Sequence, residues 1–211
     1  MKTIYFICHG QTDSNSTGAQ QSPTEPLNTN GLRQAVTVAE RTKHLPIERV
    51  ITSSMTRAEQ TGEAIAAALD LSYETSDLLR ELAIPTELQG ALPDPDPEAP
   101  INKYMKGRVA YADDPTWRFA DGENFQDLID RIAAALAFLA EQPEDHIAVV
   151  SHGRFLRALA GYVVTAGTCS GADVETFSST LKVTNTGIAV LQYDKEQWRL
   201  LTWNDMAHLA E

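Results

Sequence analysis

Two short apolar runs each end directly at a histidine followed by glycine, and this repeated arrangement constrains the fold most. Residues 4–8 (IYFIC) precede His9, and residues 147–151 (IAVVS) precede His152. Both runs have the length and β-branched content of strands buried on both faces, as in parallel sheets covered by helices. Ligands of such sheets bind beyond the carboxyl ends of the strands. The two imidazoles are therefore predicted to converge on one anion.

The remaining pattern alternates strands with helices, which predicts an α/β fold. Strands are expected at residues 3–8, 49–52, 71–74 (an edge strand), 147–151, 187–193 and 198–203. Helical spacing of apolar residues predicts four helices. The first begins after an Asn28 cap and the second at a Thr56–Glu59 capping box. The other two cover residues 124–141 and 155–163, approximately. The expected architecture is a three-layer open sheet, mostly parallel, with helices on both faces.

The length of 211 residues suits one substantial core, and neither a flexible linker nor a repeat divides the chain. A single domain over residues 1–211 is therefore expected. Residues 91–121 are rich in proline, aspartate and scattered aromatics. That composition is typical of a lid-like insertion.

Composition limits the possible partners and the compartment. A formal net charge of -12 argues against nucleic acid and anionic membranes as partners, so an anionic substrate must meet locally concentrated positive charge. No apolar stretch reaches membrane-spanning length, and residues 4–8 are too short for the core of a signal peptide. The two cysteines, Cys8 and Cys169, form no Cys-x-x-Cys pair. A cytoplasmic protein is expected, and the sequence gives no indication of the oligomeric state.

Arg57 is placed in the first turn of a helix that directly follows a strand. Its guanidinium and the free N–H groups of that helix would then point to the same place, which makes an anion site. The alternative is an ordinary solvated arginine. The position beside two histidines at strand ends favours the anion site.

Three ordered motifs carry a resemblance to a known family. They are residues 7–12 with Asn15, residues 53–61 and residues 150–153. Further residues that match the same family lie between these motifs, at positions 26–28, 31, 34–35 and 122–123. In this order the chain resembles the histidine phosphatase superfamily, also called phosphoglycerate mutase-like.

The resemblance implies phosphoryl transfer through a phosphohistidine, without a cofactor or metal. His9 would be the nucleophile, Arg57, His152 and Asn15 would hold the phosphoryl oxygens, and Glu81 would be the general acid. These residue types suit that chemistry, because imidazole is a good nucleophile, guanidinium binds phosphate bidentately, and a protonated second imidazole would add positive charge. Further phosphate contacts are expected from Cys8, Gly10, Gly153 and Arg154.

The chain departs from the family at Cys8, where the family has arginine. Loss of one preorganised charged donor costs on the order of a hundred- to a thousandfold in rate, so reduced activity is one expectation. A thiol beside cations would also tend to ionise. Arg154 is either a substitute for the missing arginine or a surface residue of its helix. Glu81 is likewise either the general acid or a solvated loop carboxylate.

Two other roles for Cys8 are unfavourable. A cysteine-dependent phosphatase needs an arginine six positions later, where this chain has Ser14. A metal site of Cys8, His9 and His152 would need adjacent strand residues to point the same way.

The leading hypothesis is a phosphatase that acts on a small phosphorylated metabolite. One alternative is a phosphoglycerate mutase-type transferase, and another is a weakly active or non-catalytic member that binds a phosphorylated ligand. Lys103, Lys106 and Arg108 in the insertion would either contact a second anionic group of the substrate or form a solvated face.

Overall fold

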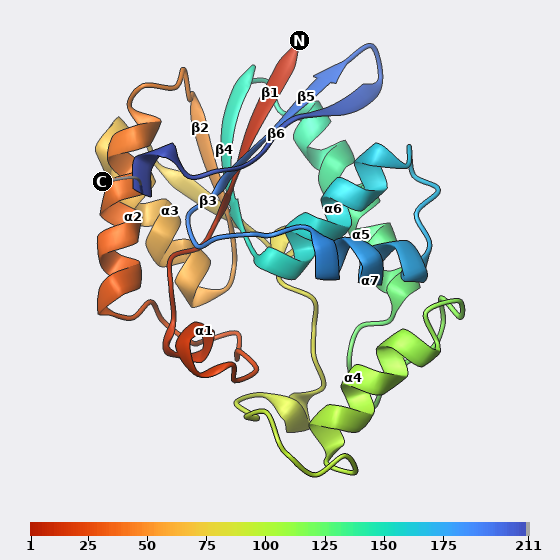
Figure 1. Cartoon of the computed structure of the whole chain (residues 1–211). Helices are drawn as coiled ribbons and strands as arrows, with labels where there is room; N and C mark the ends of the chain where they lie inside the picture. The colour runs from red at the N-terminus through yellow and green to blue at the C-terminus, as the bar shows by residue number, and fades with distance from the viewer. Residues whose placement is uncertain (210–211) are drawn as a thin grey trace.

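The computed structural model describes residues 1–209, and its strands form one six-stranded sheet in the order β3-β2-β4-β1-β5-β6 (Figure 1). Neighbours among β1 to β4 pair in parallel, whereas β5 runs antiparallel to both β1 and β6. The strands are β1 (Lys2–Cys8), β2 (Arg49–Ser53), β3 (Tyr73–Ser76), β4 (His146–Ser151), β5 (Ile188–Asp194) and β6 (Gln197–Asp205). The predicted mixed, mostly parallel sheet is confirmed.

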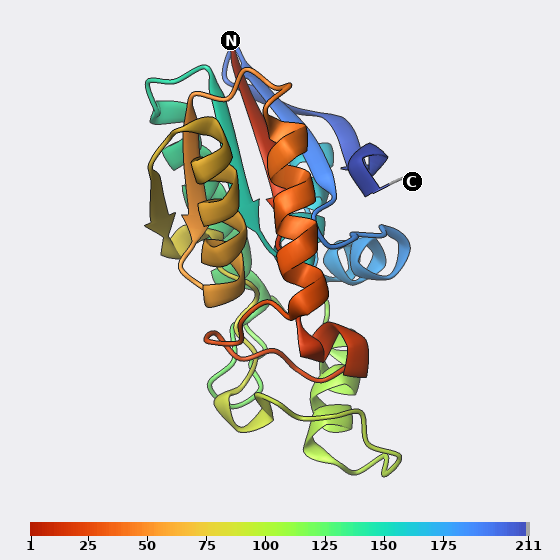
Figure 2. The ribbon, with the colours of Figure 1, turned by 90° about the vertical axis from the view of Figure 1, so that its left-hand side faces the viewer.

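Helices cover both faces of the sheet, as predicted. Helices α2 and α3 lie side by side on one face, and α5 and α6 cover the other (Figures 1 and 2). The helices of the described residues are α1 (Asp13–Thr17), α2 (Thr29–Thr42), α3 (Thr56–Leu69), α4 (Pro100–Ala110), α5 (Phe125–Glu141), α6 (Gly153–Val164) and α7 (Gly171–Thr180). Short 3₁₀ turns lie at 77–79, 86–88 and 207–209.

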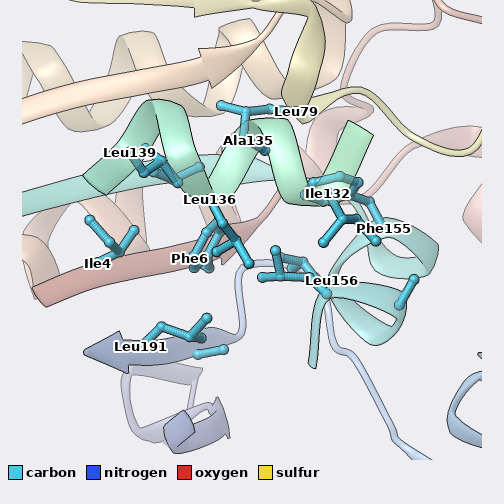
Figure 3. Close-up of a cluster of buried hydrophobic side chains, with 14 of the residues drawn as sticks. Ile4, Phe6, Leu79, Ile132, Ala135, Leu136, Leu139, Phe155, Leu156 and Leu191 are labelled. Atoms are coloured by element: carbon cyan, nitrogen blue, oxygen red, sulfur yellow. The ribbon is translucent and has the colours of Figure 1, made fainter. Parts of the chain in front are cut away.

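Strand β1 supplies side chains to two cores, which explains its unbroken apolar sequence. Ile4 and Phe6 point toward α5 and α6 (Figure 3). Tyr5 and Ile7 belong to a second core with residues of α2 and α3. Alternate strand residues face opposite sides of a sheet, so a strand covered on both sides must be apolar throughout. Removal of one such side chain, as in Phe6→Ala, costs about 3–5 kcal/mol.

Several local expectations are wrong in detail. The capping box at Thr56 does not form, because the N-cap of α3 is Met55, which makes no side-chain capping bond. Asn28 does cap α2 as expected, accepting from Gly31 N. The third strand lies at the sheet edge but begins at Tyr73 instead of residue 71. Helices α1, α4 and α7 were not predicted.

The segment of residues 91–121 contains a helix, α4, that lies apart from the sheet (Figure 1). Its buried side chains form a small cluster of their own with Leu88, made of Ala99, Ile101 and Tyr104. Arg108 of α4 pairs with Glu175 of α7. A lid function for this segment stays a prediction. Within residues 1–209, every helix is too short or too polar to cross a membrane.

Candidate active site

The carboxyl ends of β1 and β4 lie next to each other, and each strand is followed by its histidine. Cys8 is paired in register with Ser151, so His9 and His152 leave the sheet at the same level. Their ring centroids are 5.1 Å apart, with 55° between the ring planes. The predicted convergence of the two imidazoles is confirmed.

The surroundings of His9 define its tautomer. Nδ1 lies 2.6 Å from the carbonyl oxygen of Gly10, which can only accept, so Nδ1 donates the proton. The lone pair of Nε2 accepts from Nε of Arg57 at 3.2 Å. Burial and the Arg57 guanidinium lower the pKa of His9 to about 3. His9 is therefore a neutral imidazole with its lone pair beside a cation.

Arg57 extends from the first turn of α3 and is only 1% exposed, so it is not a solvated arginine. Nη1 donates to the carbonyl of Ser22 at 2.9 Å, and Nη2 contacts Sδ of Met55 at 3.3 Å. Burial lowers the pKa of Arg57, although a guanidinium keeps its proton at neutral pH. A fixed positive charge therefore lies beside Nε2 of His9.

His152 is buried behind this pair and does not line the cavity. Its Nε2 lies 2.8 Å from Oγ of Ser53 at the end of β2. Burial, followed by the charge of Arg57, lowers the pKa of His152 well below its ordinary value. In this arrangement His152 is neutral, which corrects the expectation of a protonated second imidazole.

A cavity of about 340 Å³ opens beside His9. Six other residues expected at the site line it, namely Cys8, Asn15, Arg57, Glu81, Gly153 and Arg154. Lining residues that the sequence did not indicate include Gln20, Gln21, Arg80, Gln89, Arg157 and Asn185. Arg157 lies one helical turn after Arg154, and this spacing is a signal that could have revealed it.

Gly10 does not line the cavity, which corrects its expected role in phosphate binding. Its N–H donates to Oγ1 of Thr61 at 3.0 Å, and its carbonyl accepts from His9. A Cβ at this position would come within 2.6 Å of the carbonyl oxygen of Gly31. The glycine is therefore needed for close packing of the loop against α2, and its carbonyl orients the ring of His9.

The carboxylate of Glu81 caps the N-terminus of α6. It accepts from the backbone N–H groups of Arg154 at 3.1 Å and Phe155 at 2.9 Å, and from Leu82 at 2.9 Å. Glu81 is therefore not a solvated loop carboxylate. Its role as general acid stays a prediction, which its position on the cavity wall allows.

Cys8 is 4% exposed and packs in the core on the α5 and α6 side. Burial, with a smaller effect of Glu81, raises the pKa of the thiol to about 12. The expectation that this thiol ionises beside the cations is wrong, because burial disfavours the thiolate more than nearby arginines favour it. Cys8 therefore adds no negative charge to the cavity.

Two asparagines join the loops around His9. Asn185, which precedes β5, donates to the carbonyl of His9 at 3.0 Å and to Oδ1 of Asn15 at 3.3 Å. Because Oδ1 of Asn15 is occupied, its amide nitrogen is the group that can donate to a ligand. No sequence signal connects Asn185 with His9, since they lie far apart along the chain.

The basic residues of α4 lie outside the cavity. Lys103 pairs with Glu98 at 3.2 Å, Lys106 donates to the carbonyl of Pro97 at 3.2 Å, and Arg108 pairs with Glu175. Contact of these residues with the substrate therefore stays a prediction. Among residues 1–209, no group of three or more His, Cys, Asp and Glu side chains is arranged to hold a metal ion.

Comparison with known proteins agrees with this geometry. The sequence profile of the histidine phosphatase superfamily (branch 1) matches residues 4–206. The probable phosphoglycerate mutase GpmB of Salmonella arizonae is 28% identical over 222 residues, covering 99% of this chain and 95% of that protein. A GpmB of Salmonella choleraesuis matches with the same identity and coverage.

Solved structures share the fold. Phosphoserine phosphatase from Entamoeba histolytica, in complex with phosphoserine, superposes with a TM-score of 0.79 at 23% identity and full coverage of both chains. Mycobacterial glucosyl-3-phosphoglycerate phosphatase has a TM-score of 0.75 at 24% identity, covering 97% of this chain and 99% of that one. With a profile match over nearly the whole chain, this protein belongs to the histidine phosphatase superfamily, branch 1.

Proposed function

We propose that this chain hydrolyses a phosphomonoester of a small metabolite through a phosphohistidine at His9. One observation carries the proposal: the lone pair of His9 Nε2 lies beside the buried Arg57 guanidinium, next to an open cavity. A neutral nucleophile next to a fixed cation is suited to attack an anionic phosphoryl group, because the cation stabilises the charge that spreads over the phosphoryl oxygens.

In the proposed reaction Nε2 of His9 forms a bond to phosphorus while the ester P–O bond breaks. The departing oxygen takes a proton from Glu81, whose side chain lines the same cavity. Water then attacks the phosphohistidine and gives a proton to the Glu81 carboxylate, the N–P bond breaks, and inorganic phosphate leaves. The hydrogen bond from Nδ1 of His9 to Gly10 holds the ring in place throughout.

Transfer of the phosphoryl group to a second hydroxyl is the competing function, and the similarity to GpmB proteins supports it. The same phosphohistidine would serve both reactions. Product analysis with 3-phosphoglycerate separates them, because a mutase yields the 2-phospho isomer whereas a phosphatase yields inorganic phosphate.

Cys8 motivated the hypothesis of a weakly active, ligand-binding member. The cavity contains four arginines, so a cysteine at this position does not leave it short of positive charge. We therefore favour an active enzyme. Cys8→Arg tests this point: a large gain in turnover would show that the wild-type site lacks a necessary guanidinium.

The experiment is turnover of p-nitrophenyl phosphate and a panel of phosphorylated metabolites, with trapping of the phosphoenzyme. Wild type is expected to release phosphate and to carry an acid-labile phosphoryl group. His9→Ala is expected to lose both, whereas His44→Ala, which changes an exposed histidine, keeps both. Absence of turnover by wild type, or full activity of His9→Ala, contradicts the proposal.

A further inference from the structure

Ser53 is the last residue of β2, and its fully buried hydroxyl oxygen lies 2.8 Å from Nε2 of His152. Strands β2 and β4 pair in parallel, so their carboxyl ends bring the serine and the histidine together. The same oxygen accepts from the N–H of Met55 at 3.3 Å. Ser53 does not line the cavity, so it acts on the proposed reaction only through His152.

The direction of the bond between Ser53 and His152 follows from a count of buried donors and acceptors. His152 is neutral, so one ring nitrogen carries a proton and the other a lone pair. A proton on Nε2 would make the ring donate to Ser53. The serine O–H would then have no acceptor among residues 1–209, and the lone pair of Nδ1 would have no donor.

The other tautomer satisfies more of these groups. With the proton on Nδ1, the Ser53 hydroxyl donates to Nε2 and still accepts from Met55. Within the described residues, only the Nδ1–H of His152 is then without a partner. Buried polar groups without a partner are costly, so the arrangement with one such group is favoured over the arrangement with two.

The Nδ1–H of His152 is a donor without a protein partner, close to the proposed nucleophile. Nδ1 lies across the ring from Nε2, so it faces away from Ser53. The ring centroids of His152 and His9 are 5.1 Å apart. A phosphoryl group bonded to His9 would therefore bring its oxygens next to the second ring, where they can accept a hydrogen bond that no protein group takes.

We infer that Ser53 is a positioning residue, whose hydroxyl holds the proton of His152 on Nδ1 and so makes this neutral ring a hydrogen-bond donor to the phosphoryl group. The inference rests on the proposed function and deepens it. A preorganised donor stabilises the charge that spreads over the phosphoryl oxygens in the transition state. Without Ser53 the ring can adopt the other tautomer, whose Nδ1 lone pair would repel a phosphoryl oxygen.

Substitutions of two neighbouring serines test this role in catalysis. Ser53→Ala is expected to reduce kcat about tenfold to a hundredfold, because part of the enzyme then holds His152 in the tautomer that cannot donate. Ser53→Thr keeps a hydroxyl and should recover most of the loss. Ser54→Ala is the matched control, since the Ser54 hydroxyl bonds to Asp77 and does not line the cavity, and it should keep the wild-type kcat.

Nuclear magnetic resonance of ¹⁵N-labelled histidine reports the tautomer without turnover, because ring nitrogens with and without a proton have well-separated chemical shifts. The signals of His152 are identified by their loss in His152→Gln. At neutral pH, wild type and Ser54→Ala are expected to show a protonated Nδ1 and an unprotonated Nε2. Ser53→Ala should show a mixture of both tautomers. Inorganic phosphate should shift the Nδ1–H signal of wild type, because its oxygens accept from this group.

The inference is overturned if wild-type His152 carries its proton on Nε2, or on both nitrogens. It is equally overturned if Ser53→Ala keeps the wild-type tautomer and kcat. A Ser53→Thr variant with the wild-type tautomer but the low kcat of Ser53→Ala would show that the serine acts through packing alone. If wild type turns over no ester, the proposed function fails, whereas the spectra still decide whether Ser53 sets the tautomer.

Discussion

At the residue scale, the reactivity of the cavity depends on which nitrogen of His9 carries the proton. The carbonyl of Gly10 holds that proton on Nδ1, and Arg57 faces the lone pair of Nε2. Because the pKa of His9 is lowered to about 3, the lone pair is available throughout the neutral range. Loss of activity on mild acidification would therefore have to come from another group.

Glu81 is placed to affect both catalysis and stability, and substitutions separate the two. Glu81→Gln is expected to reduce kcat about 10²–10⁴-fold for alkyl phosphates, whose leaving oxygen needs a proton. The loss should be much smaller with p-nitrophenyl phosphate, because nitrophenolate leaves without protonation. Steady-state kinetics with both substrates measure the difference.

Glu81→Ala serves as the companion variant. It removes the acceptor that Arg154 and Phe155 use at the N-terminus of α6, so it should destabilise the fold by about 1 kcal/mol in urea unfolding. Glu81→Gln keeps an oxygen acceptor and should destabilise less. Equal kcat losses with both substrates would argue against Glu81 as the proton donor.

The sequence predicts the centre of the site better than its rim. His9 and His152 follow buried strands that pair in parallel, so sheet geometry alone places them together. Asn185 reaches His9 through a loop path that no local pattern encodes. The protonation of His152 also could not be predicted, because it depends on how deeply the tertiary fold buries the ring.

At the element scale, α2 packs closely against the loop that carries His9. A Cβ added at Gly31 would lie 2.0 Å from the carbonyl oxygen of Gln11. A glycine to alanine change within a helix normally stabilises by about 1 kcal/mol. Here we expect Gly31→Ala to destabilise by about 1–3 kcal/mol in urea unfolding, because the loop must move, and to reduce kcat by displacing His9.

Thr37→Ala is the matched control, since Thr37 is exposed on the same helix. It should raise stability by a few tenths of a kcal/mol and leave kcat unchanged. A stabilised Gly31→Ala variant with wild-type kcat would show that the loop adapts without cost.

Helices are predicted correctly where buried apolar residues recur at a regular helical spacing. The apolar stripe of α5 predicts a helix over residues 124–141. The observed helix is Phe125–Glu141, with Asn124 as its N-cap. Helices α1 and α4 lie in polar, proline-containing segments, and α1 has no buried residue. Their formation depends on caps and on contacts between distant segments, which periodicity does not report.

At the scale of the whole molecule, the burial of two neutral histidines makes folding dependent on pH. Unfolding exposes His9 and His152, whose pKa values then return to about 6.5. Below that pH the unfolded state binds more protons than the folded state, so the free energy of unfolding falls as the pH falls. The contribution of His9 to the free energy of unfolding is fully present above about pH 6.5. It is lost progressively as the pH falls toward the folded-state pKa of His9, about 3.

Each histidine contributes a slope of about 1.4 kcal/mol per pH unit within this window. Urea unfolding of wild type at pH 6.0, 5.5 and 5.0 is therefore expected to show a steep loss of stability. His9→Gln should have a slope smaller by about 1.4 kcal/mol per pH unit, because glutamine does not titrate. His44→Gln, which changes an exposed histidine, should keep the wild-type slope. If His9→Gln and wild type lose stability in parallel, then the buried imidazole is already charged in the folded protein, and a neutral nucleophile at His9 is no longer tenable.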